Sequence, residues 1–271
     1  MAVNPVVLEI IRGSLSSTIH EMELLMERCA MSPFIKEKKD YFVGIFDTHG
    51  RLVCCHLSQS GPGMITPILE VYALEDMQAG DVYWYNDPYL SKGAVQHHQD
   101  MVFAVPVFHD RRAVAFAVTY GHYQDIGGLK PGSISPQATE IFHEGTLVPP
   151  IRIYRAGKLN EEAYRMFLRN SRLPHMVEGD TKAMIASCRL AESRVLELFA
   201  RYGQEIASAA FQDIIDMTAS RARGLFLELI PEAEYDFADY LDTDGVSERP
   251  YRVGLTLRRH GGRVELDATG T

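Results

Sequence analysis

Two neighbouring apolar stretches constrain the fold of this chain more than any other feature. The stretches "DMVFAVPVF" (100–108) and "AVAFAVTY" (113–120) are rich in β-branched and aromatic residues, and "HDRR" (109–112) separates them as a turn. Neither stretch alternates apolar with polar residues, so both faces of these strands are expected to be buried. The sequence therefore predicts a central hairpin in a sheet that helices cover.

Further helices and strands flank this hairpin. Apolar residues recur every three or four positions over residues 8–29, which predicts an amphipathic helix that Pro33 ends. The stretch "YFVGIFDTHGRLVCCHL" (41–57) predicts a hairpin around "DTHG", and "DVYWYN" (81–86) predicts another strand. The N-terminal part is therefore expected to form a mixed sheet.

The pattern changes from Asn160 onward, where long helical stretches begin. In the middle helix, Asp180 is the predicted N-cap and Gly203 the predicted C-cap. After Pro231 the strand-like stretches 235–242, 251–259 and 263–270 return. We predict an α+β fold with a sheet-rich metal-site domain (1–158), a helical segment (159–230) and a partial antiparallel β-meander (231–271). Because an open edge invites pairing, another chain is expected to complete this last sheet.

Composition excludes several classes of function. Hydrophobic residues make up 46% of the 271 residues, which is enough for a sizeable core. The net charge of -9 argues against a nucleic-acid partner. No stretch reaches the roughly 18 apolar residues of a membrane span, so we expect a cytoplasmic protein with no membrane partner. The four cysteines match no zinc-binding spacing and are expected to be reduced thiols.

Two H-x-x-D units flank the central hairpin. His97 and Asp100 precede its first strand, and His122 and Asp125 follow its second strand. Antiparallel pairing places the start of the first strand beside the end of the second. Both units are therefore expected to converge at one end of the sheet.

Converging imidazoles and a carboxylate indicate a cation site. Two histidines and one acid with open coordination positions would suit zinc, manganese or iron acting as a Lewis acid. The alternative is a buried polar network without an ion, and the residues alone leave both open. Asp40 stands at the mouth of a strand and is either a further ligand or a solvated surface acid.

Other polar groups give weaker signals. His143, near Glu140 and Glu144, is expected to be structural. No P-loop, G-x-G-x-x-G or G-x-S-x-G motif occurs, so no nucleotide site or nucleophile elbow is predicted. A group of arginines is expected to face solvent or a partner subunit: Arg152, Arg155, Arg165, Arg169 and Arg172.

Several long stretches of the chain resemble the hydantoinase B/oxoprolinase family. They are "NPVVLEIIRGSL", "SPFIKEKKDY", "GIFDTHGRLV", "GDVYWYNDPY", "HHQDMVFAVPVFHD", "GHYQDIGGLKPGSISPQATEIFHEGTLVPP", "FLRNSRLP" and "GDTKAMIASCRLAESRVLEL". The "DIGG…PGS…ATEI…EG…PP" run is the most specific of these. The family includes B-type subunits of ATP-dependent hydantoinases and oxoprolinases and related subunits of acetone and acetophenone carboxylases.

The resemblance implies a metal-binding subunit that works beside an A-type subunit, which binds ATP with Mg and phosphorylates the substrate. It places the metal ligands on His97, Asp100 and His122, with Asp40 as an addition. Two departures matter. This chain reads "AVQHHQD" where the hydantoinase branch has H-x-P-D, a variant associated with the ketone carboxylase branch. It is also about half as long as the B-type subunits of the family, so another chain is expected to supply the C-terminal half.

The resulting hypothesis is a metal-binding subunit of an ATP-dependent ketone carboxylase complex. The ion on His97, Asp100 and His122 would position the small-molecule substrate or bicarbonate and stabilise negative charge. A neighbouring hypothesis is ATP-dependent opening of a cyclic amide. Two rivals from other classes are an autonomous metal hydrolase without ATP and a non-catalytic structural subunit.

Overall fold

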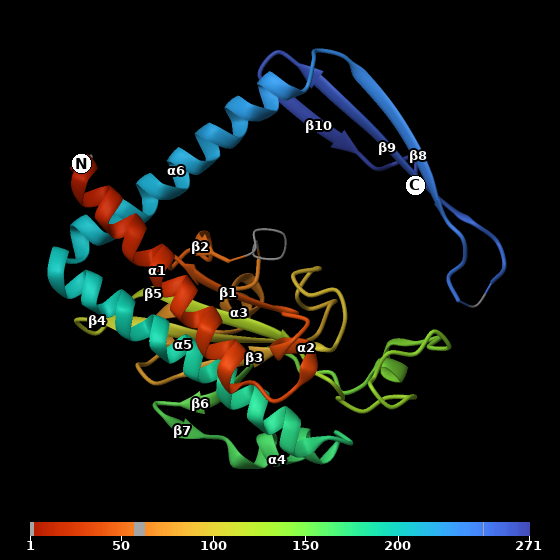
Figure 1. Ribbon diagram of the computed structural model, residues 1–271, viewed down its shortest axis with the longest axis horizontal. Helices are drawn as coiled ribbons and strands as arrows, with labels where there is room; N and C mark the ends of the chain where they lie inside the picture. The colour runs from red at the N-terminus through yellow and green to blue at the C-terminus, as the bar shows by residue number, and fades with distance from the viewer. Residues whose placement is uncertain (1–2, 57–62, 246) are drawn as a thin grey trace. The chain divides into compact units, whose positions relative to one another are not determined.

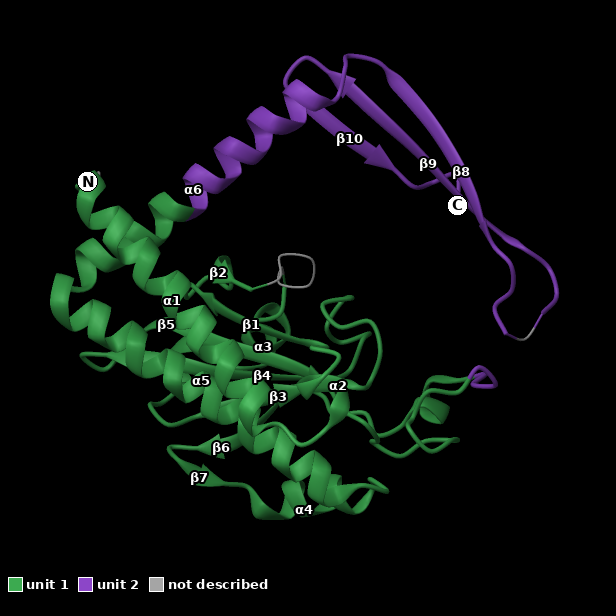
Figure 2. Cartoon of the chain, viewed as in Figure 1, with its two compact units in different colours: residues 1–135, 140–214 green, residues 136–139, 215–271 purple. Residues whose placement is uncertain are grey.

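The computed structural model describes residues 3–56, 63–245 and 247–271 (Figure 1). It divides into two compact units, coloured separately in Figure 2. The first contains residues 1–135 and 140–214, and the second contains residues 136–139 and 215–271. The predicted domain boundaries near residues 158 and 230 divide the chain differently and stay a prediction.

A seven-stranded sheet forms the centre of the first unit, in the order β2-β1-β5-β4-β3-β6-β7. Its strands are β1 (Tyr41–Phe46), β2 (Leu52–Cys55), β3 (Val82–Tyr85), β4 (Asp100–His109), β5 (Arg112–His122), β6 (Ile151–Arg155) and β7 (Lys158–Leu159). The α+β class is confirmed. The described pairings are all antiparallel, whereas a mixed sheet was expected. No crossover helix separates the pairs that follow one another in sequence, and a parallel pair would need one.

Both faces of this sheet are covered, as the apolar strands predict. On one face α1 (Pro5–Cys29) and α5 (Pro174–Tyr202) pack together, and α5 lies across β4 and β5 (Figure 1). On the other face α3 (Thr66–Val71) and neighbouring loop residues close an aromatic core. Burial of the interior of β4 and β5 on both faces fixes the register of the hairpin, because a one-residue slip would exchange the two faces.

The helix boundaries differ from the sequence prediction at two points. The helix α1 ends at Cys29, and Pro33 instead begins the short helix α2 (Pro33–Lys36), where its missing N–H costs nothing. Asp180 was expected as an N-cap but lies inside α5, which begins at Pro174. The local pattern "GDTKAM" resembles a helix start, but six helical residues precede Asp180 in the chain. Gly203 is confirmed as the C-cap, with a φ of 79°.

The remaining helices are short or lead into the second unit. They are η1 (Leu74–Asp76), η2 (Ile141–Glu144), α4 (Glu161–Arg169) and α6 (Gln204–Leu229). All four cysteines are free thiols. Across residues 3–56, 63–245 and 247–271, no helix has both the length and the apolar character that crossing a bilayer requires.

The second unit contains an antiparallel sheet of three strands. Its order is β10-β9-β8, formed by β8 (Glu234–Leu241), β9 (Tyr251–His260) and β10 (Arg263–Asp267). These are the strands that the sequence predicts. Every residue of β8 is exposed, including Phe237 at 59% and Leu241 at 61%. Completion of this sheet by another chain stays a prediction.

Candidate metal centre

The register of the central hairpin places the first H-x-x-D unit, His97 to Asp100, beside His122. Asp100, the first residue of β4, is the direct partner of His122, the last residue of β5. His97 lies in the preceding turn, where its carbonyl oxygen accepts a hydrogen bond of 3.3 Å from the Asp100 N–H. The antiparallel pairing expected from the sequence is therefore present and gathers these three residues at one end of the sheet.

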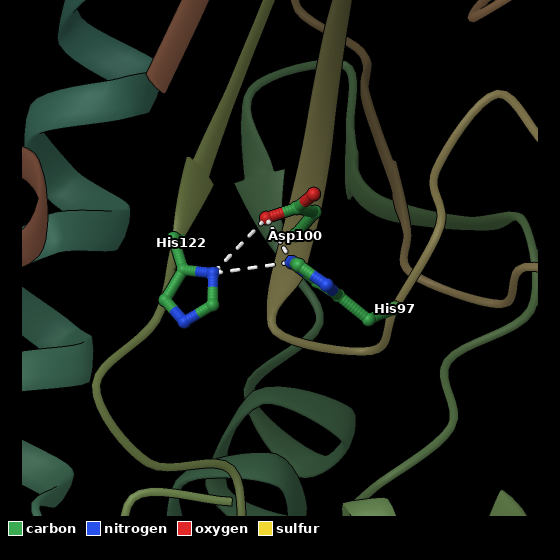
Figure 3. A group of neighbouring side chains, drawn as sticks. All are labelled: His97, Asp100 and His122. Carbon is green, nitrogen blue, oxygen red and sulfur yellow. Dashed lines mark hydrogen bonds and ion pairs between the residues drawn. The ribbon is translucent and has the colours of Figure 1, made fainter. Parts of the chain in front are cut away.

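The donor atoms of the three side chains point toward one another (Figure 3). His97 Nε2 lies 3.1 Å and His122 Nδ1 lies 3.3 Å from Asp100 Oδ1, and the two nitrogens are 3.2 Å apart. A tetrahedral ion with ligand bonds of about 2.0–2.1 Å separates its ligands by about 3.3 Å. The donor set thus has the chemistry and the spacing of a divalent cation site.

Burial differs among the three side chains. The His122 side chain is 4% exposed and that of Asp100 is 14% exposed, whereas that of His97 is 46% exposed. Asp100 Oδ1 is buried and, within the described residues, accepts no hydrogen bond of good geometry. A buried carboxylate oxygen without a donor is costly, and a cation would satisfy it. Access to the cluster is on the side of His97.

The charges within the cluster are coupled. Burial alone would raise the pKa of Asp100, but contacts with His122 and His97 hold that pKa below its ordinary value. The contact with Asp100 raises the pKa of His97, against the opposing effect of burial. Without a metal, the cluster is therefore stabilised as a carboxylate beside a readily protonated imidazole.

Asp40 lies beside the cluster but outside the group of three. Its Oδ2 is 4.0 Å from His122 Nδ1, and its side chain is 35% exposed and 3.9 Å from Lys38 Nζ. The backbone link is closer, because the His122 N–H donates a hydrogen bond of 3.0 Å to the Asp40 carbonyl oxygen. Its role as an additional ligand stays a prediction.

Asp125, the acid of the second H-x-x-D unit, does not join the cluster. Its carboxylate accepts hydrogen bonds from the N–H groups of Gly127 and Gly132 and from the backbone and guanidinium of Arg172. Arg172 also donates to the carbonyl oxygens of Gly127, Gly128 and Lys130. The Arg172 side chain is 40% exposed, and it also holds the glycine-rich loop, a role that the sequence did not predict.

Sequence reasoning also missed an aromatic neighbour of the cluster. The ring of Phe34, in α2, packs on the imidazole of His122 with centroids 4.6 Å apart. Nothing in the local pattern around Phe34 predicts this contact, because it joins residues far apart in the chain. The only signal is that "SPFIKEKKDY" is among the stretches that resemble the family.

The fold and the cluster together define an antiparallel α+β domain with a candidate cation site at one end of its sheet. The family model for hydantoinase B/oxoprolinase matches residues 4–271. The chain therefore belongs to the hydantoinase B/oxoprolinase family, and the resemblance is confirmed.

Relatives of three kinds are similar to the chain. The B-type component of a putative D-/L-hydantoinase from Pseudomonas sp. (strain NS671) is 32% identical over 99% of this chain and 47% of its own length. The acetophenone carboxylase delta subunit from Aromatoleum aromaticum is 28% identical over 90% of this chain and 35% of its own length. The crystal structure of the ATP-dependent caprolactamase from Pseudomonas jessenii matches with a TM-score of 0.86 and 27% identity, over 98% of this chain and 46% of that chain. The chain thus spans about half the length, or less, of the relatives it matches.

Proposed function

We propose that His97, Asp100 and His122 bind a divalent metal ion, and that the chain contributes this centre to an ATP-dependent enzyme complex that acts at a carbonyl carbon. The observation that carries the proposal is the spacing of the three donor atoms, at 3.1, 3.2 and 3.3 Å. The donor set of two imidazoles and one carboxylate fits zinc, manganese or iron.

Each residue has a distinct part in this proposal. When bound, the ion would polarise a substrate oxygen and stabilise the negative charge that develops on it. Asp100 supplies the negative charge of the site, His122 forms its buried wall, and the half-exposed His97 leaves an approach for the substrate. Asp40 is close enough to become a further ligand through a side-chain rotation. Phe34 shields the His122 ring from water.

The proposal places the ATP and Mg site on an A-type partner subunit. The sequence has no P-loop, and one similar structure is that of an ATP-dependent caprolactamase. This partner would be needed for turnover.

Two substrate classes fit the site, and each has one observation in its favour. The "AVQHHQD" variant favours carboxylation of a ketone, in which the site would position the ketone or a bicarbonate-derived group. The names of the hydantoinase and caprolactamase relatives favour opening of a cyclic amide. Both reactions begin with a carbonyl oxygen that needs a positive charge beside it.

The test is an assay of the native assembly, purified with its partners. Bicarbonate-dependent ATP hydrolysis stimulated by acetone or acetophenone would identify a carboxylase, whereas bicarbonate-independent hydrolysis stimulated by a hydantoin or lactam would identify an amide hydrolase. Elemental analysis of the same sample should give about one divalent ion per chain. An assembly that is active without a stoichiometric metal would refute the proposal. An inactive, metal-free chain in an otherwise complete assembly would indicate a structural role.

A further inference from the structure

A second buried carboxylate lies outside the candidate metal centre, on helix α5. Asp180 has no exposed surface, and its Oδ1 accepts hydrogen bonds of 2.6 Å from the Met31 N–H and 3.0 Å from the Ser32 N–H. Its Oδ2 is buried and has no hydrogen-bond partner within the described residues. Burying a carboxylate is costly unless it is hydrogen-bonded. The two hydrogen bonds from the Met31 and Ser32 N–H groups therefore compensate part of the cost of burying the Asp180 carboxylate.

The backbone that Asp180 holds leads directly into helix α2. Ser32 is the N-cap of α2, and its hydroxyl accepts a hydrogen bond of 3.4 Å from the Ile35 N–H. Ile35 is fully buried and covers Gly121, the residue before His122. A Cβ on Gly121 would come within 2.7 Å of the Ile35 Cδ1 atom, so the Ile35 side chain occupies the space above this glycine.

The same segment forms one wall of the metal cluster. Phe34 packs on the His122 imidazole, and its carbonyl oxygen accepts a hydrogen bond of 2.9 Å from the Asp40 N–H. The Asp40 carbonyl oxygen in turn accepts the His122 N–H. A continuous chain of contacts thus runs from Asp180 through residues 31–40 to the backbone and ring of His122.

The residue after Asp180 contacts Tyr123, the residue that follows His122 in the chain. The hydroxyl groups of Thr181 and Tyr123 form a short hydrogen bond, and both side chains are buried. Tyr123 directly follows His122 in the chain. Adjacent residues of α5 therefore contact both the segment that leads into α2 and the residue next to His122.

We propose that Asp180 is a positioning residue of the metal centre. Asp180 accepts hydrogen bonds from the N–H groups of Met31 and Ser32 and so fixes residues 31–40. In this position Phe34 keeps the His122 ring directed at Asp100 and His97. Asp180 acts through the backbone, and none of its contacts is with the cluster itself. The inference rests on the proposed function, because a positioning role requires that His97, Asp100 and His122 bind a metal.

Variants of Asp180 in the full chain test this role in two independent ways. Asp180→Ala removes the acceptor, and Asp180→Asn keeps an acceptor oxygen of the same size. Asp180→Glu keeps the charge but moves it by one methylene, which gives a second test if the alanine variant fails to fold. The matched control is Ser187→Ala, because Ser187 is equally buried on α5 and donates to the Met22 carbonyl oxygen of α1, away from residues 31–40.

The first measurement is amide hydrogen exchange of the metal-free protein. Exchange in residues 31–40 should become faster in the alanine and glutamate variants than in the wild-type protein. It should stay unchanged in the asparagine and Ser187→Ala variants. Because no metal is present, this readout is independent of metal binding and of activity.

The second measurement is the affinity for Zn²⁺ alone by calorimetry. Loss of support around a ligand typically weakens metal binding by 10-fold to 100-fold, and we expect at least about 10-fold for Asp180→Ala and Asp180→Glu. Asp180→Asn and Ser187→Ala should bind as the wild type does. The expected outcome is that faster exchange and weaker binding occur in the same variants.

The possible failures are distinguishable. Wild-type affinity in both the alanine and glutamate variants would overturn the positioning role and leave the proposed function intact. An equal loss in Asp180→Asn would show that the acceptor is not the cause, and an equal loss in Ser187→Ala would show a general effect of destabilising α5. A wild-type chain that binds no Zn²⁺ would overturn the proposed function, and the positioning role would fall with it.

Discussion

Asp100 is the residue on which the charge of the cluster depends. Its carboxylate is mostly buried and touches both imidazoles through the same oxygen atom. Removing one partner of a buried charged pair leaves the other charge uncompensated, which makes this contact costly to break. A bound cation would compensate the negative charge of the Asp100 carboxylate without requiring a proton on either imidazole.

The first prediction concerns metal binding by single ligands. His122→Ala and Asp100→Asn should each lose stoichiometric metal, because two remaining donors do not hold a divalent ion tightly. Elemental analysis of the dialysed protein measures this. His20→Ala is the control, because His20 lies on α1 with a 69% exposed side chain and belongs to no such cluster among the described residues. Full metal content in His122→Ala would exclude His122 as a ligand.

The second prediction concerns the pKa of His97 in the metal-free protein. Its imidazole should titrate above 6.5 in an NMR pH series, and Asp100→Asn should lower this pKa because contact with the Asp100 carboxylate is the main cause of the rise. Metal and proton compete for the same nitrogen, so metal affinity should decline as the pH falls through the raised pKa. A pKa of His97 that Asp100→Asn leaves unchanged would contradict the assigned cause.

The same shifts set the pH range in which the metal-free cluster stabilises the fold. The folded pKa of Asp100 is lowered, so its contribution is present above 3.8 and is lost as the pH falls through the lowered value. The folded pKa of His97 is raised, so its contribution is present below 6.5 and is lost as the pH rises through the raised value. The joint contribution is therefore greatest between these two pH values.

At the scale of elements, Arg172 holds the glycine-rich loop after β5 together with the Asp125 carboxylate and the Ser133 hydroxyl. Arg172 donates to the Asp125 carboxylate and to three carbonyl oxygens of residues 127–130. Gly127 and Gly128 both have positive φ, and a Cβ on Gly128 would come within 2.6 Å of a backbone oxygen. The fixed shape of the loop thus depends on its glycines, and the Arg172 guanidinium group contributes to it.

The third prediction follows from this arrangement. Arg172→Ala should lower the free energy of unfolding by about 2 kcal/mol, since it leaves the buried Asp125 without its cation, while partial exposure of the arginine limits the loss. Urea denaturation measures the change. Arg169→Ala, an exposed neighbour at the end of α4, should change the stability by less than about 0.5 kcal/mol. Equal losses in the two variants would contradict the role of Arg172.

The elements show what local sequence can and cannot predict. Apolar strands, turn residues and antiparallel geometry sufficed to place His97, Asp100 and His122 together, because these residues belong to one hairpin and the turn before it. The roles of Phe34, Asp180 and Arg172 depend on packing between segments far apart in the chain, and such contacts leave no periodic pattern. Asp125 repeats the H-x-x-D spacing, but its carboxylate accepts hydrogen bonds from N–H groups of its own loop and does not join the cluster.

At the scale of the whole molecule, the three-stranded sheet of the second unit has two chemically different faces. Alternation along β8 places Tyr235, Phe237 and Leu241 on one face together with a single acid, Asp239. This face lies next to Leu255 and Leu257 of β9. The other face carries charged residues, among which Arg258 pairs with Glu234 and Asp267. An exposed apolar sheet face of this kind promotes association.

The fourth prediction tests that property. Phe237→Lys should reduce binding of a hydrophobic dye and concentration-dependent association of the purified chain, without lowering its melting temperature, because Phe237 is 59% exposed. Tyr240→Lys is the control, since Tyr240 is 57% exposed on the same strand but points to the other face. Light scattering measures the association. Similar effects of both substitutions would show that added charge, rather than the apolar face, governs association.

The hairpin β4–β5 has one irregularity, a register shift between Val107 and Phe108, close to its turn. The strand from Asp100 to His109 spans about 30 Å at roughly 3.3 Å per residue. The turn residues Asp110 and Arg111 are thus remote from the ligands. The register shift at Val107 and Phe108 can accommodate a change in the turn, so that the strand pairing near the ligands is not displaced. This turn is therefore a natural attachment point for a fluorophore or an affinity tag that leaves the opposite end of the ribbon undisturbed.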